Sequence, residues 1–425
     1  MLASLLSAFK IPELRKRILY VFGMIGIFVL GLHIAVPGID RVAMEKLFSS
    51  GGLLGLMDVF SGGALRKFSI FAMGIAPYIN ASIIMQLLTI AVPSLEEMSK
   101  EGESGRKKIT QYTRYLAVVL AFFQGGGICL WLSKSNILSV STVTFPMIVI
   151  TLVAGTAFLM WLGEQITEKG IGNGISLLIF TGILARMPND ISQVAQSIRA
   201  HAVTFFDVLL FLAIFVAMVV GIIFIQQGQR RIPVQYAKRV VGRRMYGGQS
   251  TFIPLKVNQS GVIPIIFAVS VLLFPATVAQ FAPQVGTFGS VMAWIKNIFS
   301  PGSFWYTFFY AVLVVLFTFF YTAVIFNPVE VADNMKKYGG FVPGIRPGRP
   351  TAEYLNKVIT RITMAGAFFL AFIAVVPTYL MNLTHIQIYY MYGGTSLLIM
   401  VGVALETMQQ IEAHLLMRNY EGFIK

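Results

Sequence analysis

Residues 205–226 read FFDVLLFLAIFVAMVVGIIFIQ, and this stretch decides the class of fold because its only charged residue, Asp207, stands near its start. A helix of about 20 consecutive apolar residues crosses the roughly 30 Å hydrocarbon core of a bilayer. A helix is the expected form, because backbone amides in lipid find no water to bond. The stretch therefore predicts a membrane-spanning helix.

The composition extends this prediction to the whole chain of 425 residues, of which 56% are hydrophobic and 12% charged. A soluble domain carries roughly 25% charged residues, so half that share leaves too little polar surface to face water all round. We therefore expect an all-α polytopic membrane protein. The ten predicted spans are residues 18–36, 69–92, 112–133, 145–163, 172–187, 205–226, 260–281, 304–326, 358–379 and 391–411.

The basic residues give the predicted orientation. Ten spans put both termini on one side, and that side holds 25 of the 33 Lys and Arg residues, against 8 on the other. The positive-inside rule then predicts both termini in the cytoplasm. A basic stretch from Lys10 to Arg17 precedes the first span as in a signal peptide, but no small-residue cleavage site follows, so we expect a retained span.

Two spans share a glycine–proline pattern near their starts. Residues 74–79 read GIAPYI in the second span, and residues 261–266 read GVIPII in the seventh. These spans are five apart, so an internal repeat would run in opposite directions through the membrane, as in inverted-repeat proteins. Glycine and proline are common in membrane helices, so the pattern alone leaves repeat and coincidence equally open.

The segment from Gly51 to Phe68 is too short and too charged to span the membrane, since it contains Asp58, Arg66 and Lys67. Its apolar residues suit a short helix folded back into a cavity that is lined by protein or water. A surface helix on the outer face is the alternative, and the sequence does not choose between the two.

The spans contain almost no ionisable residues, and Glu406 is the one clear case. Ion-coupled transporters and pumps need such groups at depth. The single cysteine, Cys129, and the four scattered histidines offer no catalytic pair and no metal motif, and no Gly-x-x-x-x-Gly-Lys loop occurs. The sequence therefore disfavours an enzyme, a metal site and a self-powered pump.

A path without charges is still gated if a hydrophobic constriction excludes water and ions. Ile75 and Ile79 share a helix face at the i, i+4 spacing, and Ile175 and Ile179 repeat that spacing. Ile265 follows the second glycine–proline pattern. Isoleucine on a membrane helix more often faces lipid or packs against a neighbour, so the spacing alone favours that plainer interpretation.

Two long loops carry much of the basic charge. Loop 226–258 holds seven Lys and Arg residues and no Asp or Glu, and loop 327–357 contains PGIRPGRP at residues 343–350. Contact with acidic lipid explains such charge, and so does docking of an acidic partner such as the phosphate backbone of ribosomal RNA. Proline and glycine around the arginines favour a presented contact over a diffuse patch.

Five motifs resemble the SecY family of bacterial protein-conducting channels, and the resemblance runs from the first span to the last. They are residues 101–106 (EGESGR), 161–167 (WLGEQIT), 170–176 (GIGNGIS), 341–348 (FVPGIRPG) and 393–399 (GGTSLLI). The resemblance implies the central pore subunit of the Sec protein translocase. Such a subunit is a passive channel that secretes unfolded polypeptides across the plasma membrane and inserts transmembrane segments into it laterally.

The resemblance also implies two inverted halves, residues 1–190 and 191–425, that close like a clamshell around an hourglass pore. A plug helix at about residues 53–68 would seal the outer funnel, and a lateral gate would open between spans two and three and spans seven and eight. The implied residues are Ile75, Ile79, Ile175, Ile179, Ile265 and Ile399 for the pore ring, Leu56, Met57, Val59, Phe60, Leu65 and Arg66 for the plug, and Gln86, Gln124 and Asn258 for the gate.

The implied partners are the SecE and SecG subunits, the motor ATPase SecA, the ribosome, signal sequences and nascent polypeptides, and membrane lipids. Arg243, Arg244 and Arg346 are the implied docking residues for the ribosome or the motor, and no cofactor is implied. An inverted-repeat secondary transporter of a small solute is the alternative, because it shares the broken helices. It would need a polar site at mid-membrane, for which the spans offer few candidates. An intramembrane enzyme would need a catalytic pair.

Overall fold

A helix lies at each of the ten predicted span positions. The computed structural model describes residues 9–39, 43–44, 58, 61–135, 137–138, 144–201, 204–236, 239–241, 244–246, 250–281, 286–300, 303–384 and 394–422. The ten helices are α2 (Pro12–Gly31), α5 (Ala76–Ala91), α7 (Glu103–Lys134), α8 (Thr144–Lys169), α9 (Gly174–Arg199), α10 (Phe205–Gln227), α11 (Ile263–Phe281), α13 (Phe304–Ile325), α15 (Arg349–Thr384) and α17 (Gly394–Gly422). Three shorter helices, α6 (Pro93–Lys100), α12 (Gly286–Ile298) and α14 (Pro328–Lys337), have no counterpart in the predicted spans.

Among the described residues, five helices are long and apolar enough to cross a membrane by length and composition alone, namely α7, α8, α10, α13 and α15. A sixth span results if α5 and α6 count together, and these two helices meet at a bend of 99°. None of the residues of α6 is buried. The apolar helix α5 is therefore followed by a polar helix, α6, that turns away from the end of α5.

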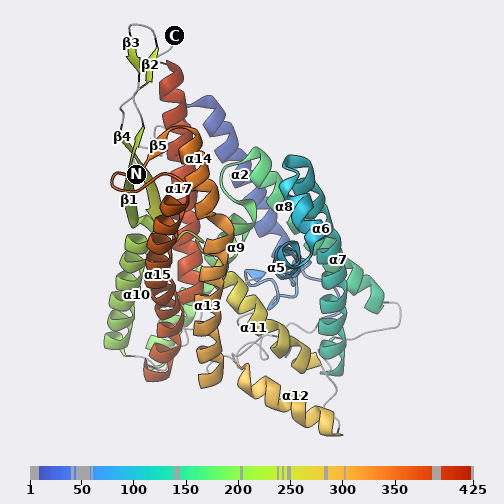
Figure 1. Cartoon of the computed structure of the whole chain (residues 1–425). Coiled ribbons are helices and arrows are strands. Elements are labelled where there is room, and N and C mark those ends of the chain that lie inside the picture. The colour runs from blue at the N-terminus through green and yellow to red at the C-terminus, as the bar shows by residue number, and fades with distance from the viewer. Residues whose placement is uncertain are drawn as a thin grey trace.

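The helices form two connected sets. One set is α2, α5, α7, α8 and α9, and the other is α10, α11, α13, α15 and α17. The sets meet where α9 packs against α17 and where α11 packs against α5 and α7. Figure 1 shows α5 to α8 on one side of the molecule and α10, α13, α15 and α17 on the other, with α11 crossing between them.

Both glycine–proline patterns lie at helix starts, which corrects the predicted boundaries of two spans. Gly74 and Gly261 adopt left-handed backbone angles, with φ of 57° and 64°. Glycine takes such angles without the steric cost that a Cβ atom brings. Each glycine is followed two residues later by the first residue of a helix, and proline occupies the second position of α5 and of α11. Residues 70–75 form turns where the sequence predicts the beginning of the second span.

The two terminal helices bring their polar ends together. Leu14 and Ile18 of α2 belong to one buried cluster with Ile171 and with Ile411 near the end of α17. Arg17 at the same end donates a hydrogen bond to the carbonyl oxygen of Gly170 over 3.5 Å. The first turns of α2 and the last turns of α17 therefore lie at the same end of the bundle, as an even number of spans requires.

The predicted loop 226–258 contains strands that the sequence analysis did not anticipate. Strand β1 (Gln229–Tyr236) pairs antiparallel with β4 (Ser250–Lys256), and β5 (Gly340–Phe341) pairs with the end of β1. A second hairpin joins β2 (Arg239–Val241) to β3 (Arg244–Tyr246). The buried face of the larger sheet carries Ile232 and Val234, which pack against the first turns of α15.

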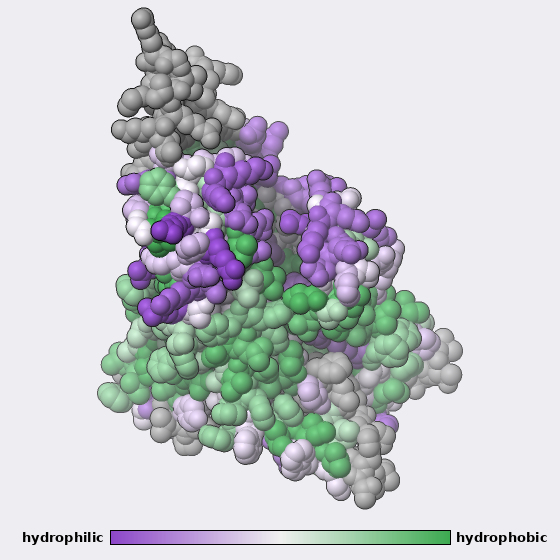
Figure 2. All heavy atoms as spheres, in the orientation of Figure 1, coloured by the Kyte–Doolittle hydropathy of each residue, from purple (hydrophilic) through white to green (hydrophobic). Residues whose placement is uncertain are grey.

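Hydropathy divides the molecule into zones. Figure 2 shows hydrophilic residues gathered at the end that carries the β-strands, α14 and α6, above a broad hydrophobic band over α10, α15, α13 and α11. Large apolar side chains in this band are exposed in the isolated chain, among them Phe224 at 77% and Phe368 at 63%. Such exposure is expected where lipid replaces water as the solvent of a helix face.

Candidate functional site

Five of the six predicted ring isoleucines lie in one extended buried hydrophobic cluster, which also contains residues of α2, α8, α10, α13 and α15. One of the five lies directly before α5, and the other four lie on α5 and α9 of the first set and on α11 and α17 of the second. Their exposed fractions are 8% or less. The five are Ile75, Ile79, Ile179, Ile265 and Ile399.

The sixth predicted ring residue, Ile175, is only half buried and packs at the edge of that cluster. A Cβ atom at Gly163 would lie 3.0 Å from the Cγ1 atom of Ile175, so this side chain lies against α8. Asn173 fixes the start of α9, because its side-chain oxygen accepts hydrogen bonds from the N–H groups of Ile175 and Ser176. Ile179 follows one turn further along the same helix face.

The described part of the predicted plug is mostly buried, with Lys67 exposed, which argues against a surface helix for these residues. Asp58, Ala64 and Phe68 are exposed by 2% or less. Residues 62–68 form turns rather than a continuous helix. The backbone continues as a bridge between Ala35 and Ser69 and ties the segment to the residues that follow α2. The predicted plug residues Leu65 and Arg66 lie in this part, and Leu56, Met57, Val59 and Phe60 lie outside the described residues.

A buried ion pair joins this segment to α9. Arg186 Nη1 lies 3.2 Å from Asp58 Oδ2, and the two side chains are exposed by 12% and 3%. Asp58 Oδ1 accepts a second bond, from the backbone N–H of Arg66, over 2.9 Å. One carboxylate oxygen of Asp58 therefore stabilises the turn of its own segment, and the other oxygen contacts the neighbouring helix α9.

Two glycines let the backbones of the segment and α9 come into direct contact. A Cβ atom at Gly62 would lie 2.6 Å from Gly182 Cα, and one at Gly182 would lie 2.9 Å from Gly62 Cα. Real Cβ atoms do not approach other atoms so closely, so a larger residue would force the two apart. Ile179, Gly182 and Arg186 follow one another at i, i+3 and i+7 on one face of α9. One predicted ring residue, Ile179, and both contacts of the segment therefore lie along one face of α9.

A polar contact crosses the seam between the two helix sets. The hydroxyl of Tyr321 on α13 donates a short hydrogen bond to Gln86 Oε1 on α5. Phe267 on α11 packs edge to face against Tyr321 and Phe317, with ring centroids 5.2 and 5.8 Å apart. Gln86 was predicted at this seam. Tyr321 was not predicted, because α13 carries three tyrosines and three threonines and the sequence does not single out one of these hydroxyls.

The other two predicted gate residues have different surroundings. Asn258 is 3% exposed and binds its own turn before α11, where its Nδ2 atom donates to the carbonyl oxygen of Gly261 over 2.8 Å. Ser260 donates to Asn258 Oδ1 over 3.1 Å. Gln124 is half buried on α7. Gln86 is therefore the predicted gate residue that bonds across the seam.

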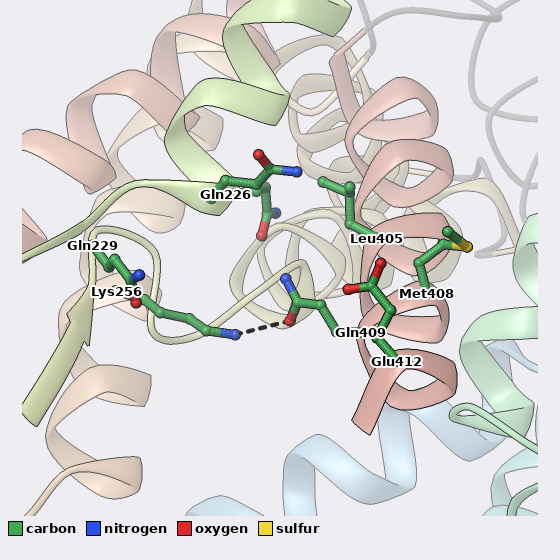
Figure 3. A pocket seen from close by; sticks show the side chains of 8 residues that line it. Gln226, Gln229, Lys256, Leu405, Met408, Gln409 and Glu412 are labelled. Atoms are coloured by element: carbon green, nitrogen blue, oxygen red, sulfur yellow. Dashed lines mark hydrogen bonds between the residues drawn. The ribbon is translucent and has the colours of Figure 1, made fainter. Parts of the chain in front are cut away.

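A polar cavity of about 360 Å³ lies between the end of α10 and the middle of α17, next to β1 and β4. Figure 3 shows Lys256 reaching across it to Gln409, to which it donates a hydrogen bond of 3.1 Å. Glu412 and several glutamines complete the lining. A lining with both signs of charge and many amides favours no single class of ion. Among the described residues, no group of three or more His, Cys, Asp or Glu side chains could hold a metal ion.

Residues 343–350, which carry Arg346 and Arg349, pack against the buried cluster beneath the larger sheet. Arg346 is exposed, while Ile345 packs against the buried cluster beneath the sheet. The Arg346 carbonyl oxygen accepts a hydrogen bond from the Thr351 hydroxyl over 2.8 Å. Of the other predicted docking residues, Arg244 begins β3 and Arg243 lies outside the described residues. The structure thus presents Arg346 from a defined backbone.

Comparisons with known proteins agree with this architecture. The family model described as SecY matches residues 69–408. The protein translocase subunit SecY of Streptomyces scabiei is 49% identical over 441 residues, covering 100% of both chains. That of Escherichia coli K12 is 47% identical over 420 residues, covering 97% of this chain and 94% of the other.

Solved structures show the same fold at low sequence identity. A SecY structure whose plug domain stabilises the closed state of the translocation channel aligns with a TM-score of 0.64 and 15% identity, covering 94% of this chain and 92% of that one. Sec61 in a canine ribosome–channel complex aligns with a TM-score of 0.59 and 15% identity over the same shares. The predicted all-α polytopic membrane fold is therefore confirmed. The chain belongs to the SecY family and is the central pore subunit of a Sec protein translocase.

Proposed function

We propose that the buried isoleucine cluster is the closed waist of the protein-conducting pore. The observation that supports this proposal is that both helix sets contribute to one continuous buried apolar core, which contains five of the six predicted ring isoleucines together with residues of α2, α8, α10, α13 and α15. A ring of isoleucine side chains makes no specific hydrogen bonds, so it closes against ions and still adapts to any extended chain. A charged ring would bind some segments and repel others.

The two connected helix sets support the proposed halves, residues 1–190 and 191–425, with the waist where they meet. The left-handed glycines at the starts of α5 and α11 occupy matching places, five spans apart, which supports an inverted repeat. An apolar centre offers a small solute no polar binding site, so these observations favour a polypeptide channel over the alternative of a secondary transporter.

The segment around Asp58 is proposed to be the plug. We call the ion pair between Asp58 and Arg186 the plug latch. The lateral gate is proposed to run between α5 and α7 on one side and α11 and α13 on the other, closed in part by the Gln86–Tyr321 bond. A signal helix gains roughly 0.3–0.6 kcal/mol per strongly apolar residue in lipid. That suffices to bias a gate that is poised near balance.

The chain is proposed to lie in the plasma membrane with both termini in the cytoplasm. The 25-to-8 division of basic residues supports this orientation. The proposed partners are SecE, SecG, SecA, the ribosome, signal sequences and nascent polypeptides, and membrane lipids. The exposed Arg346 on its folded base supports docking of an acidic surface there. A related channel, Sec61, is found in a ribosome complex.

Crosslinking tests the waist directly. The native Cys129 is replaced by alanine, cysteines are placed at Ile79 or Ile265, and a secretory chain carrying its own cysteine is stalled halfway through the channel. We expect disulfide crosslinks from both positions, because the waist encloses the chain. A cysteine at Val220, which is 60% exposed on α10, is the matched control and should not crosslink. Equal crosslinking at Val220, or none at Ile79 and Ile265, would overturn the proposed waist.

A further inference from the structure

The loop that joins α8 to α9 contacts α17, which belongs to the other helix set. The backbone N–H of Gly172 donates a hydrogen bond to Gln410 Oε1 over 2.8 Å. The bond lies where α9 packs against α17, one of the places at which the helix sets meet, and we call this place the α9–α17 seam. Residues 170–174 belong to the GIGNGIS motif and have no part in the proposed waist, plug or gate. Their contact with α17 therefore calls for an explanation of its own.

Glycines give this loop a single shape. Gly172 has a left-handed φ of 93°, which glycine adopts without steric cost. A Cβ atom at Gly174 would lie 1.9 Å from the carbonyl oxygen of Gly163 on α8, so the two backbones touch. The N–H of Gly174 donates a hydrogen bond to Thr167 Oγ1 over 2.9 Å. The loop is thus fixed to α8, and the N–H of Gly172 has a set direction.

The side chain of Ile171 is anchored between the helix sets. It is 4% exposed and lies in one buried cluster with Leu14 and Ile18 of α2 and with Ile411 of α17. Helix α2 belongs to the same set as the loop, whereas α17 belongs to the other set. Moving α17 away would expose this apolar side chain to water, which is unfavourable. A hydrogen bond and a shared apolar cluster therefore hold the same end of the α9–α17 seam.

The gate seam, where α5 meets α11 and α13, is held differently. Its polar contact joins two side chains, those of Gln86 and Tyr321, and side chains change rotamer without movement of the backbone. At the α9–α17 seam the donor is a backbone N–H in a loop of fixed shape. When one seam between two packed bodies opens and another holds, the bodies rotate about the seam that holds.

We propose that the contact of residues 170–173 with α17 is a pivot about which the two helix sets rotate when the gate opens, with Gln410 as the positioning residue that holds Gly172. This inference rests on the proposed lateral gate. The chain itself supplies a second fixed point, because α9 ends at Arg199 and α10, in the other set, begins at Phe205. The two fixed points lie at opposite ends of α9, so the rotation axis runs along this helix.

Pulsed electron spin resonance on the complete translocase in lipid nanodiscs tests the pivot, with and without a secretory chain stalled in the channel. In a Cys129→Ala background, one pair of spin labels replaces Lys169 and Leu416 across the α9–α17 seam. A second pair replaces Ile90 and Ile325 across the gate seam, and all four of these side chains are exposed. We expect the stalled chain to lengthen the distance across the gate seam and to change the other distance by less than about a fifth as much.

The two distances distinguish a failure of the pivot from a failure of the gate. Equal lengthening of both distances would overturn the pivot and leave the proposed gate intact. A distance across the gate seam that does not change would contradict the proposed gate and, with it, any rotation of the helix sets.

Variants of Gln410 test its role as a positioning residue. Gln410→Leu removes the oxygen that accepts the bond and keeps a side chain of similar size. With the chain stalled, the distance across the α9–α17 seam should lengthen in this variant, and export of a secretory precursor into membrane vesicles should fall roughly fivefold, as the loss of one hydrogen bond implies. Gln410→Glu keeps an oxygen acceptor at this position and should behave like the unchanged protein in both measurements.

The matched control is Gln409→Leu, at the neighbouring glutamine on the same helix. Gln409 accepts its bond from Lys256, and this bond does not join the two helix sets. The control variant should leave the distance across the α9–α17 seam and the rate of export unchanged. If Gln410→Leu matched Gln409→Leu in both measurements, Gln410 would have no positioning role.

Discussion

The proposed waist and the proposed plug latch meet on one face of α9, where Ile179 and Arg186 lie, but they differ in chemistry. The proposed waist consists of buried isoleucines, whereas the proposed latch is a buried ion pair that lies beside a close contact between two glycine backbones. The waist must open for any passing sequence, so the absence of specific hydrogen bonds lets it adapt. The plug must stay closed until a substrate arrives, so a few specific contacts that break together suit it better.

Removing one partner of the latch should have the largest effect. Arg186→Ala leaves Asp58 as a buried, unpaired charge, and breaking a buried pair in this way costs about 3–5 kcal/mol. We expect the plug to leave its seat, so that the resting ion conductance of planar bilayers containing the channel rises at least tenfold. The double variant Asp58→Ala/Arg186→Ala should leak less than Arg186→Ala, because no unpaired charge remains.

The control for the latch is Lys100→Ala. Its ion pair with Glu96 is exposed, by 70% and 50%, and exposed pairs contribute about 1 kcal/mol or less. This variant should conduct like the unchanged channel. If Arg186→Ala leaked no more than Lys100→Ala, the latch would have no part in the seal.

Enlarging a glycine should have the next largest effect. A valine at Gly182 meets the backbone of Gly62, and overpacking of this kind costs about 1–3 kcal/mol. The population with a displaced plug, measured as resting conductance, should rise roughly 5- to 150-fold. Gly126→Val on α7 is the matched control, because a Cβ atom there meets nothing within 4 Å. Equal conductance of the two variants would count against a plug seated on α9.

A smaller effect is expected at the seam. Tyr321→Phe removes the hydrogen bond to Gln86 and keeps the ring against Phe267, so the closed gate should lose about 1 kcal/mol. Membrane insertion of a marginally hydrophobic signal sequence should become roughly fivefold more efficient. Tyr338→Phe, at an exposed tyrosine after α14, should change nothing. Additive effects of Tyr321→Phe and Gln86→Ala would show that the two residues do not act through a shared bond.

The smallest effect is expected within the waist itself. Ile265→Leu keeps the volume and apolar character of a fully buried side chain, and such swaps cost less than about 1.5 kcal/mol. Resting conductance should stay within about threefold of the unchanged channel, far below that of Arg186→Ala. A leak as large as that of Arg186→Ala would mean that the waist depends on the fit of individual isoleucines.

The helices could be predicted from the sequence because each apolar run carries its own signal. The run before Gln227, for example, holds one charge in the 22 residues from 205 to 226, and no tertiary contact is needed to recognise it. The glycine–proline patterns at residues 74 and 261 also marked real breaks, since both glycines adopt left-handed angles. The sequence did not show that these glycines precede the first helical residue, because that depends on the turns formed by the residues before each helix.

The latch and the sheet could not be read from the sequence, because both depend on residues brought together from afar. Asp58 and Arg186 lie in two segments more than 100 residues apart, each with other charged residues nearby, and only packing pairs them. In strand β1 the two buried residues, Ile232 and Val234, are flanked by polar residues, so the apolar pattern is weak. Pro233 between them also argues against a strand. Proline is tolerated there because the short β5 reaches only Gln235 and Tyr236.

The contact between Gly62 and Gly182 has a kinetic consequence. Two bare backbones have no side chains to change rotamer, so separation cannot proceed through a series of half-loosened arrangements. Current through an individual molecule should therefore jump between well-separated levels, with dwell times set by how long the glycine contact and the neighbouring ion pair hold together.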